Sequence, residues 1–133
     1  MKPAPIVLAV IVITASQIAP FAAHAQMEQL KQTTPEQRAT LQTALMAERL
    51  GLTADQKTKV AALNLTYATK MEPIIKGSAG PLREMREIRQ INDEKEAELK
   101  QILTPTQFQQ YLASKEEMRQ KFEKRILENA GKS

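Results

Sequence analysis

Three copies of one helix-starting pattern, the capping box, constrain what this chain can fold into. In a capping box, a Ser or Thr at the helix N-cap and a Glu or Gln three residues later each accept a hydrogen bond from the other residue's backbone N–H group. The copies are Thr34-Pro35-Glu36-Gln37, Thr53-Ala54-Asp55-Gln56 and Thr104-Pro105-Thr106-Gln107. Proline at the first helical position strengthens the first and the last copy. We therefore expect helices to begin at these three boxes.

Apolar residues recur at helical spacing after each box. The clearest stripes belong to the second and the last helix: Val60, Leu63, Tyr67, Met71 and Ile74, then Phe108, Tyr111, Leu112, Met118, Phe122 and Ile126. The first helix has only a short stripe, Leu41, Ala44 and Leu45. A turn over residues 76–81, with two glycines and a proline, predicts a further helix over about residues 82–103, whose apolar positions drift around its axis. We predict an all-α fold of three to four helices.

Residues 1–25 have the features of a cleavable signal peptide. Lys2 gives a positive start, residues 6–13 are an unbroken apolar run, and Ala23-His24-Ala25 fits the small-x-small cleavage pattern. This run is far shorter than the roughly 20 apolar residues of a membrane-spanning helix. We therefore predict a periplasmic mature chain, residues 26–133, that forms one helical domain without a transmembrane segment. Residues 26–33 are expected to be a flexible lead-in, and residues 129–133 a frayed end.

The composition of the predicted mature chain argues against several classes of site. The whole chain has 19 Lys and Arg, 15 Asp and Glu and one His, so loss of Lys2 and His24 leaves 18 positive against 15 negative charges, a net charge of +3. Without His or Cys, the usual ligands of zinc, copper and nickel are missing, and so is the nucleophile–histidine pair of many hydrolases. The positive residues are also spread along the chain, and they do not form the single basic stripe that is typical of nucleic-acid-binding proteins. We expect no enzyme activity, cofactor, metal site or nucleic-acid partner.

Two of the boxes belong to a longer repeated motif, L-T-x-x-Q. Its copies are Leu52-Thr53-Ala54-Asp55-Gln56 and Leu103-Thr104-Pro105-Thr106-Gln107, about fifty residues apart. Two copies at this spacing, after a signal peptide and in a helical setting, resemble the LTxxQ-motif family of periplasmic proteins (Spy/CpxP-like). The resemblance covers roughly residues 35–126.

The resemblance implies a fold and a function. Members of that family resemble bent four-helix hairpin chains that pair as antiparallel homodimers into a shallow cradle. Spy-like members are ATP-independent chaperones that hold unfolding envelope proteins under stress. CpxP-like members also damp a sensor kinase, so a regulatory module that docks on an envelope stress sensor is an alternative, and a structural helical envelope protein without clients is another. Metal-binding relatives use His and Cys, which the mature chain lacks.

Two groups of residues follow from these considerations. The motif residues Leu52, Thr53, Gln56, Leu103, Thr104 and Gln107 are expected to act mainly as structural helix caps. Under the chaperone interpretation, the candidate client contacts are Lys70, Lys76, Arg83, Met85, Arg86, Ile88 and Arg89. The alternative interpretation places the apolar members of this second group in the core, and its arginines are then either solvated or paired with Glu84 and Glu87.

Overall fold

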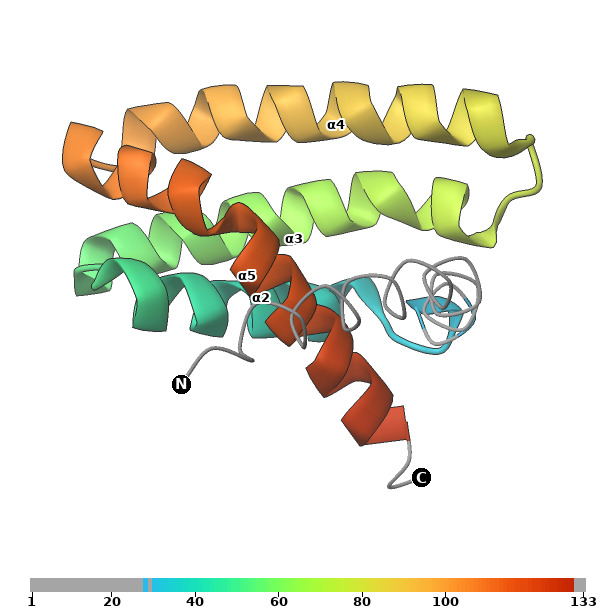
Figure 1. Cartoon of the computed structure of the whole chain (residues 1–133), viewed down its shortest axis with the longest axis horizontal. Helices are drawn as coiled ribbons and strands as arrows, with labels where there is room; N and C mark the ends of the chain where they lie inside the picture. Colours follow the sequence, from blue (N-terminus) through green and yellow to red (C-terminus); the bar gives the residue numbers. More distant parts are fainter. Residues whose placement is uncertain (1–27, 29, 131–133) are drawn as a thin grey trace, which may run out of the picture.

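The computed structural model describes residues 28 and 30–130, and within them every regular element is a helix. The four labelled helices are α2 (Pro35–Leu50), α3 (Ala54–Lys76), α4 (Pro81–Ile102) and α5 (Pro105–Ala130). The predicted all-α fold is confirmed. The predicted signal peptide lies outside the described residues. In Figure 1, α2, α3 and α4 lie side by side, whereas α5 crosses obliquely over the others.

The helices begin where the capping boxes predict. The Thr34 hydroxyl accepts a hydrogen bond from the Gln37 backbone N–H, and the Gln37 side chain accepts one from the Thr34 N–H. The boxes at Thr53 and Thr104 are closed in the same way. The start of α4 differs: its N-cap, Gly80, has a φ of 106° and makes no side-chain capping bond. The positive φ explains why glycine stands there, because other residues rarely adopt it.

The packing of the helices is uneven. α2 packs against α3 and α5, and α3 packs against α4, but α4 and α5 make little contact. Figure 1 shows the two diverging after the turn that joins them. The first predicted helix, α2, is thus an integral part of the bundle. α5 continues to Ala130, past the expected start of the frayed end at residue 129.

The apolar core lies toward the end of the bundle that holds both L-T-x-x-Q motifs. Its buried members come from all four helices and their turns: Met46, Leu50, Val60, Leu63, Tyr67, Leu99, Leu103 and Met118. The predicted α3 stripe is buried except for Met71, which is half-buried. Two stripe positions were predicted wrongly, because Ala44 is exposed and Leu112 is 41% exposed. Polar side chains are buried on the same two helices, namely Arg38 and Thr43 of α2 and Ser114 of α5.

One of those polar side chains, Arg38, ties α2 to its surroundings. Its guanidinium forms an ion pair with Glu72 of α3 and donates hydrogen bonds to the backbone carbonyls of Leu30 (3.3 Å) and Thr33 (2.8 Å). Only 3% of Arg38 is exposed. The Leu30 and Thr33 part of the expected flexible lead-in is therefore held on α2 by a buried charge. The bonds from Lys76 and from Arg38 hold the pKa of Glu72 below its ordinary value.

The two L-T-x-x-Q motifs meet through their glutamines. Gln56 Nε2 donates to Gln107 Oε1 at 2.7 Å, and Gln107 Nε2 donates to Gln56 Oε1 at 3.1 Å. Each amide also reaches the end of the helix that precedes the other motif. Gln56 Nε2 lies 3.3 Å from the Ile102 carbonyl oxygen, and Gln107 Nε2 lies 3.3 Å from that of Leu50. Each glutamine thus caps its own helix, binds its counterpart and satisfies a carbonyl at a helix C-terminus.

This reciprocal pair predicts a thermodynamic coupling between the motifs. Gln56→Ala and Gln107→Ala should each lower the free energy of unfolding by about 2 kcal/mol, since each removes a cap and partly buried hydrogen bonds. The double variant should lose less than the sum, by about 0.5–1.5 kcal/mol, because either single change already breaks the shared bonds. Urea denaturation followed by circular dichroism measures all three values.

Gln37 supplies the matched control. It closes the α2 box in the same way, but its side chain is exposed and, among the described residues, forms a hydrogen bond only with its own cap. Gln37→Ala should therefore cost about 1 kcal/mol and add to Gln56→Ala without coupling. If the losses in the free energy of unfolding for Gln56→Ala and Gln107→Ala add fully in the double variant, the motifs act only as separate caps.

Candidate functional site

The predicted client contacts gather at the end of the α3–α4 hairpin, away from the motifs. Lys70 lies 4.6 Å from the centre of the Tyr67 ring and 3.5 Å from a Glu94 carboxylate oxygen. Lys76 pairs with Glu72 at 2.8 Å. Both lysines are exposed but already have acidic partners, so they are weak candidates for a free binding surface.

The start of α4 carries a different surface, which we call the α4 patch: Leu82, Met85, Arg86 and Arg89. These positions are spaced i, i+3, i+4 and i+7, so they share one face of the helix. Leu82 is 79% exposed and Met85 is 61% exposed, the largest values among the bulky apolar residues of the described chain. The alternative prediction, that the apolar members are core, is wrong for Met85.

The arginines of this helix fall into two kinds. Arg83 Nε pairs with Glu87 at 3.0 Å, as the alternative interpretation expected. Arg86 and Arg89 are exposed and form no ion pair with any residue that the structure describes. The α4 patch therefore joins two exposed apolar side chains to two unneutralised guanidinium groups. Ile88 differs from the patch residues, because it is half-buried and turned toward the inside of the bundle.

A groove runs along the inside, where α5 diverges from α4. It consists of two hollows of about 250 Å³ and about 220 Å³ that share Gln42, Asn92, Lys95 and Phe122. We call it the Lys95 groove. The first hollow is lined by α2, α4 and α5, and its apolar walls include Leu45, Met46, Tyr111 and Met118. The second lies mainly between α2, α3 and α4, with Met71, Ile75, Ile88 and Ile91 among its walls.

Lys95 stands where the two hollows join. Its Nζ atom donates a hydrogen bond to Gln42 Oε1 at 3.1 Å, and it forms no ion pair with the described residues. Burial lowers the pKa of the Lys95 ammonium to about 8, although the neighbouring Glu96 acts in the opposite direction. The groove therefore contains a half-buried positive charge that forms no ion pair with a carboxylate of the described residues.

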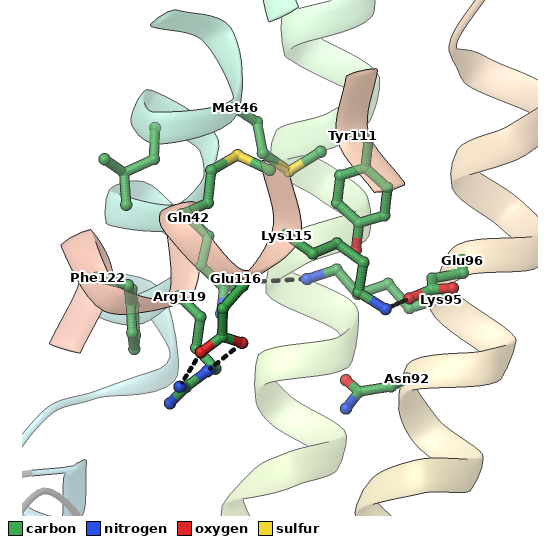
Figure 2. A pocket seen from close by; sticks show the side chains of 12 residues that line it. Gln42, Met46, Asn92, Lys95, Glu96, Tyr111, Lys115, Glu116, Arg119 and Phe122 are labelled. Atoms are coloured by element: carbon green, nitrogen blue, oxygen red, sulfur yellow. Dashed lines mark hydrogen bonds and ion pairs between the residues drawn. The ribbon is translucent and has the colours of Figure 1, made fainter. Parts of the chain in front are cut away.

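The other charges of the groove neutralise one another. Figure 2 shows Lys115 of α5 reaching across to Glu96 of α4, with Lys95 beside them. Glu116 binds Arg119 through both carboxylate oxygens, and that bond holds the pKa of Glu116 below its ordinary value. Each carboxylate that lines the groove is thus held by a cation. Such carboxylates are poorly placed to act as a general acid or base.

Sequence patterns contain little sign of this groove. Lys95 and Glu96 belong to the run Asp93-Glu94-Lys95-Glu96, whose alternating charges are typical of a solvated helix face. Which of those charges turns inward depends on how α5 crosses α2, and no local pattern encodes that crossing. One weak signal existed: the drifting apolar positions of α4 indicated that this helix faces more than one neighbour.

The sequence matches a family described as a domain of unknown function, DUF4890, over residues 22–111. The chain belongs to this family. The match includes both L-T-x-x-Q motifs, the α4 patch and the α4 side of the Lys95 groove. No curated protein and no solved structure matches the chain. Over residues 28 and 30–130, no helix is both long enough and apolar enough to cross a bilayer.

The burial of Lys95 predicts a pH-dependent stability difference. Below pH 8 the folded protein carries a charged, poorly hydrated ammonium, so Lys95→Met should raise the free energy of unfolding by about 1–2 kcal/mol at pH 7. Between pH 8 and the ordinary lysine value of 10.5, the unfolded chain binds this proton more tightly than the folded chain does. The stability of the parent protein should therefore rise relative to Lys95→Met as the pH increases through this window.

Denaturation of both proteins at pH 7, 8, 9 and 10 measures the difference. Lys100→Met, which removes an exposed lysine from the same helix, is the control and should show no such trend. A constant difference between Lys95→Met and the parent from pH 7 to pH 10 would contradict the depressed lysine pKa.

Proposed function

We propose that the mature chain, residues 26–133, is a periplasmic holding chaperone that binds unfolding envelope proteins without ATP. The α4 patch carries the proposal, because it presents exposed Leu82 and Met85 beside the free charges of Arg86 and Arg89. Unfolded proteins expose apolar segments together with acidic side chains. Such a segment would bury the Leu82 and Met85 side chains and neutralise the arginines.

The chemistry of the patch suits unlike partners. Met85 has a flexible, polarisable side chain that adapts to differently shaped apolar groups. Long-range attraction to the arginines speeds encounter, and it weakens as salt is added. A homodimer, which we propose as the working form, would offer two patches and hold one extended client at two points.

We further propose that the chain is related to the LTxxQ-motif, Spy/CpxP-like proteins. The reciprocal hydrogen bonds between Gln56 and Gln107 support this, because they give the glutamine of each motif copy a role that a lone capping box would not need. The periplasmic location rests on the signal-like residues 1–25.

Aggregation of a thermally or chemically unfolded test protein, followed by light scattering without ATP, checks the proposal. The purified mature chain should suppress scattering at near-stoichiometric ratios. The double variant Leu82→Gln, Met85→Gln should need at least about tenfold more protein for half suppression, because two apolar contacts are lost. The variant Arg86→Gln, Arg89→Gln should need about two- to tenfold more, as expected for exposed charges.

Two matched controls locate the effect. Lys100→Gln, Lys124→Gln removes the same charge from exposed lysines elsewhere, and Leu112→Gln, Leu127→Gln removes two exposed leucines of α5. Both should suppress scattering like the parent chain. If the folded parent chain suppresses nothing, the chaperone proposal fails, and a regulatory module with one docking partner becomes the better interpretation. If the patch variants match their controls, clients bind elsewhere.

A further inference from the structure

The Lys95 groove has the features of a ligand site that is separate from the α4 patch. Its two hollows, about 250 Å³ and about 220 Å³, adjoin each other at Gln42, Asn92, Lys95 and Phe122. Small-molecule sites are typically hollows with mostly apolar walls and a few placed polar groups. The second hollow follows this pattern, because aliphatic and aromatic side chains form most of its wall beyond the Lys95 ammonium, whereas charged side chains stand among the apolar ones in the first.

The shape indicates an elongated ligand. One arm extends from Lys95 toward Leu45, Met46 and Met118, between α2 and α5. The other extends toward Met71 and Ile88, between α3 and α4. Methionine side chains stand in both arms, and their flexibility allows the walls to close around a chain of variable length. A flexible hydrocarbon chain fits such walls better than a rigid, polar or branched molecule does.

The charge of the groove indicates a single negative group. Lys115 is paired with Glu96, and Arg119 is paired with Glu116. After these pairs are formed, the Lys95 ammonium is the remaining positive charge in the groove, and Gln42 is its one hydrogen-bond acceptor among the described residues. A monoanion would complete this site, whereas a second negative charge would find no free cation inside it. The Gln42 and Asn92 amides offer N–H donors close to the same point.

We propose that the Lys95 groove binds a single-chain amphiphile with one carboxylate, such as a medium- or long-chain fatty acid. The carboxylate lies on the Lys95 ammonium, and the hydrocarbon chain lies along the apolar arm between α3 and α4. An ion pair formed at this half-buried ammonium is stronger than one formed in open water, because the groove walls exclude part of the solvent. This inference does not rest on the proposed chaperone function, since it uses residues other than those of the α4 patch.

Laurate, kept below its micelle-forming concentration, is the probe, and isothermal titration calorimetry with the mature chain measures its binding. Laurate should bind at one site per chain. Lys95→Met, which keeps the length of the side chain but removes its charge, should weaken laurate at least about tenfold, as expected for a lost charged hydrogen bond. Dodecanol, with the same chain length and no charge, should bind both proteins alike.

Lys100→Met is the control and should bind laurate like the parent chain. Nuclear magnetic resonance then gives the location: laurate should shift the backbone amide signals of Gln42, Asn92 and Phe122 more than those of Leu82 and Met85. The proposal is overturned if laurate does not bind, if Lys95→Met binds it as tightly as the parent, or if the largest shifts fall on Leu82 and Met85. Equal binding of dodecyltrimethylammonium would also overturn it, because only detergent-like adsorption ignores the sign of the headgroup.

Discussion

The hydrogen bonds between the side-chain amides of Gln56 and Gln107 determine how the two halves of this protein are joined. Each half is a pair of helices with an L-T-x-x-Q turn, and the glutamines bind these turns to each other at 2.7 Å and 3.1 Å. Since each amide also binds the last carbonyl of a helix from the other half, the ends of α2 and α4 and the starts of α3 and α5 meet at one place. The buried core residues Leu50 and Leu103 lie next to this junction.

Concentrating the core at one end leaves the rest of the molecule less tightly packed, and both candidate sites arise there. At the far end, the α3–α4 turn extends beyond the core (Figure 1), and no residue of the described part of the chain covers Leu82 and Met85. Along the side, α5 crosses toward α2 and away from α4, and the resulting gap becomes the Lys95 groove (Figure 2). The surface and the groove are therefore consequences of the same arrangement.

Local patterns predicted the helices well, because the information that starts a helix lies within a few residues of it. The boxes at Thr34, Thr53 and Thr104 marked three starts, and the glycine–proline turn marked the fourth. Contacts between distant residues escaped prediction. A glutamine at the third helical position reads as a complete cap, so nothing in the sequence showed that Gln56 and Gln107, fifty-one residues apart, bind each other. The buried Arg38 and the half-buried Lys95 were missed for a related reason, since charged side chains on a helix are usually solvated.

The two proposed sites share one helix, and this has a physical consequence. Ile88 lines the groove, while Met85, three residues before it, and Arg89, the next residue, face outward in the α4 patch. The first turns of α4 have few packing partners, so their order depends on contacts made on the groove side. A hydrocarbon chain in the groove would add such contacts at Ile88 and reduce the freedom of the helix that presents the patch. Two ligands that order the same segment favour each other's binding even without a change of shape, because the first has already met part of the entropic cost of the second.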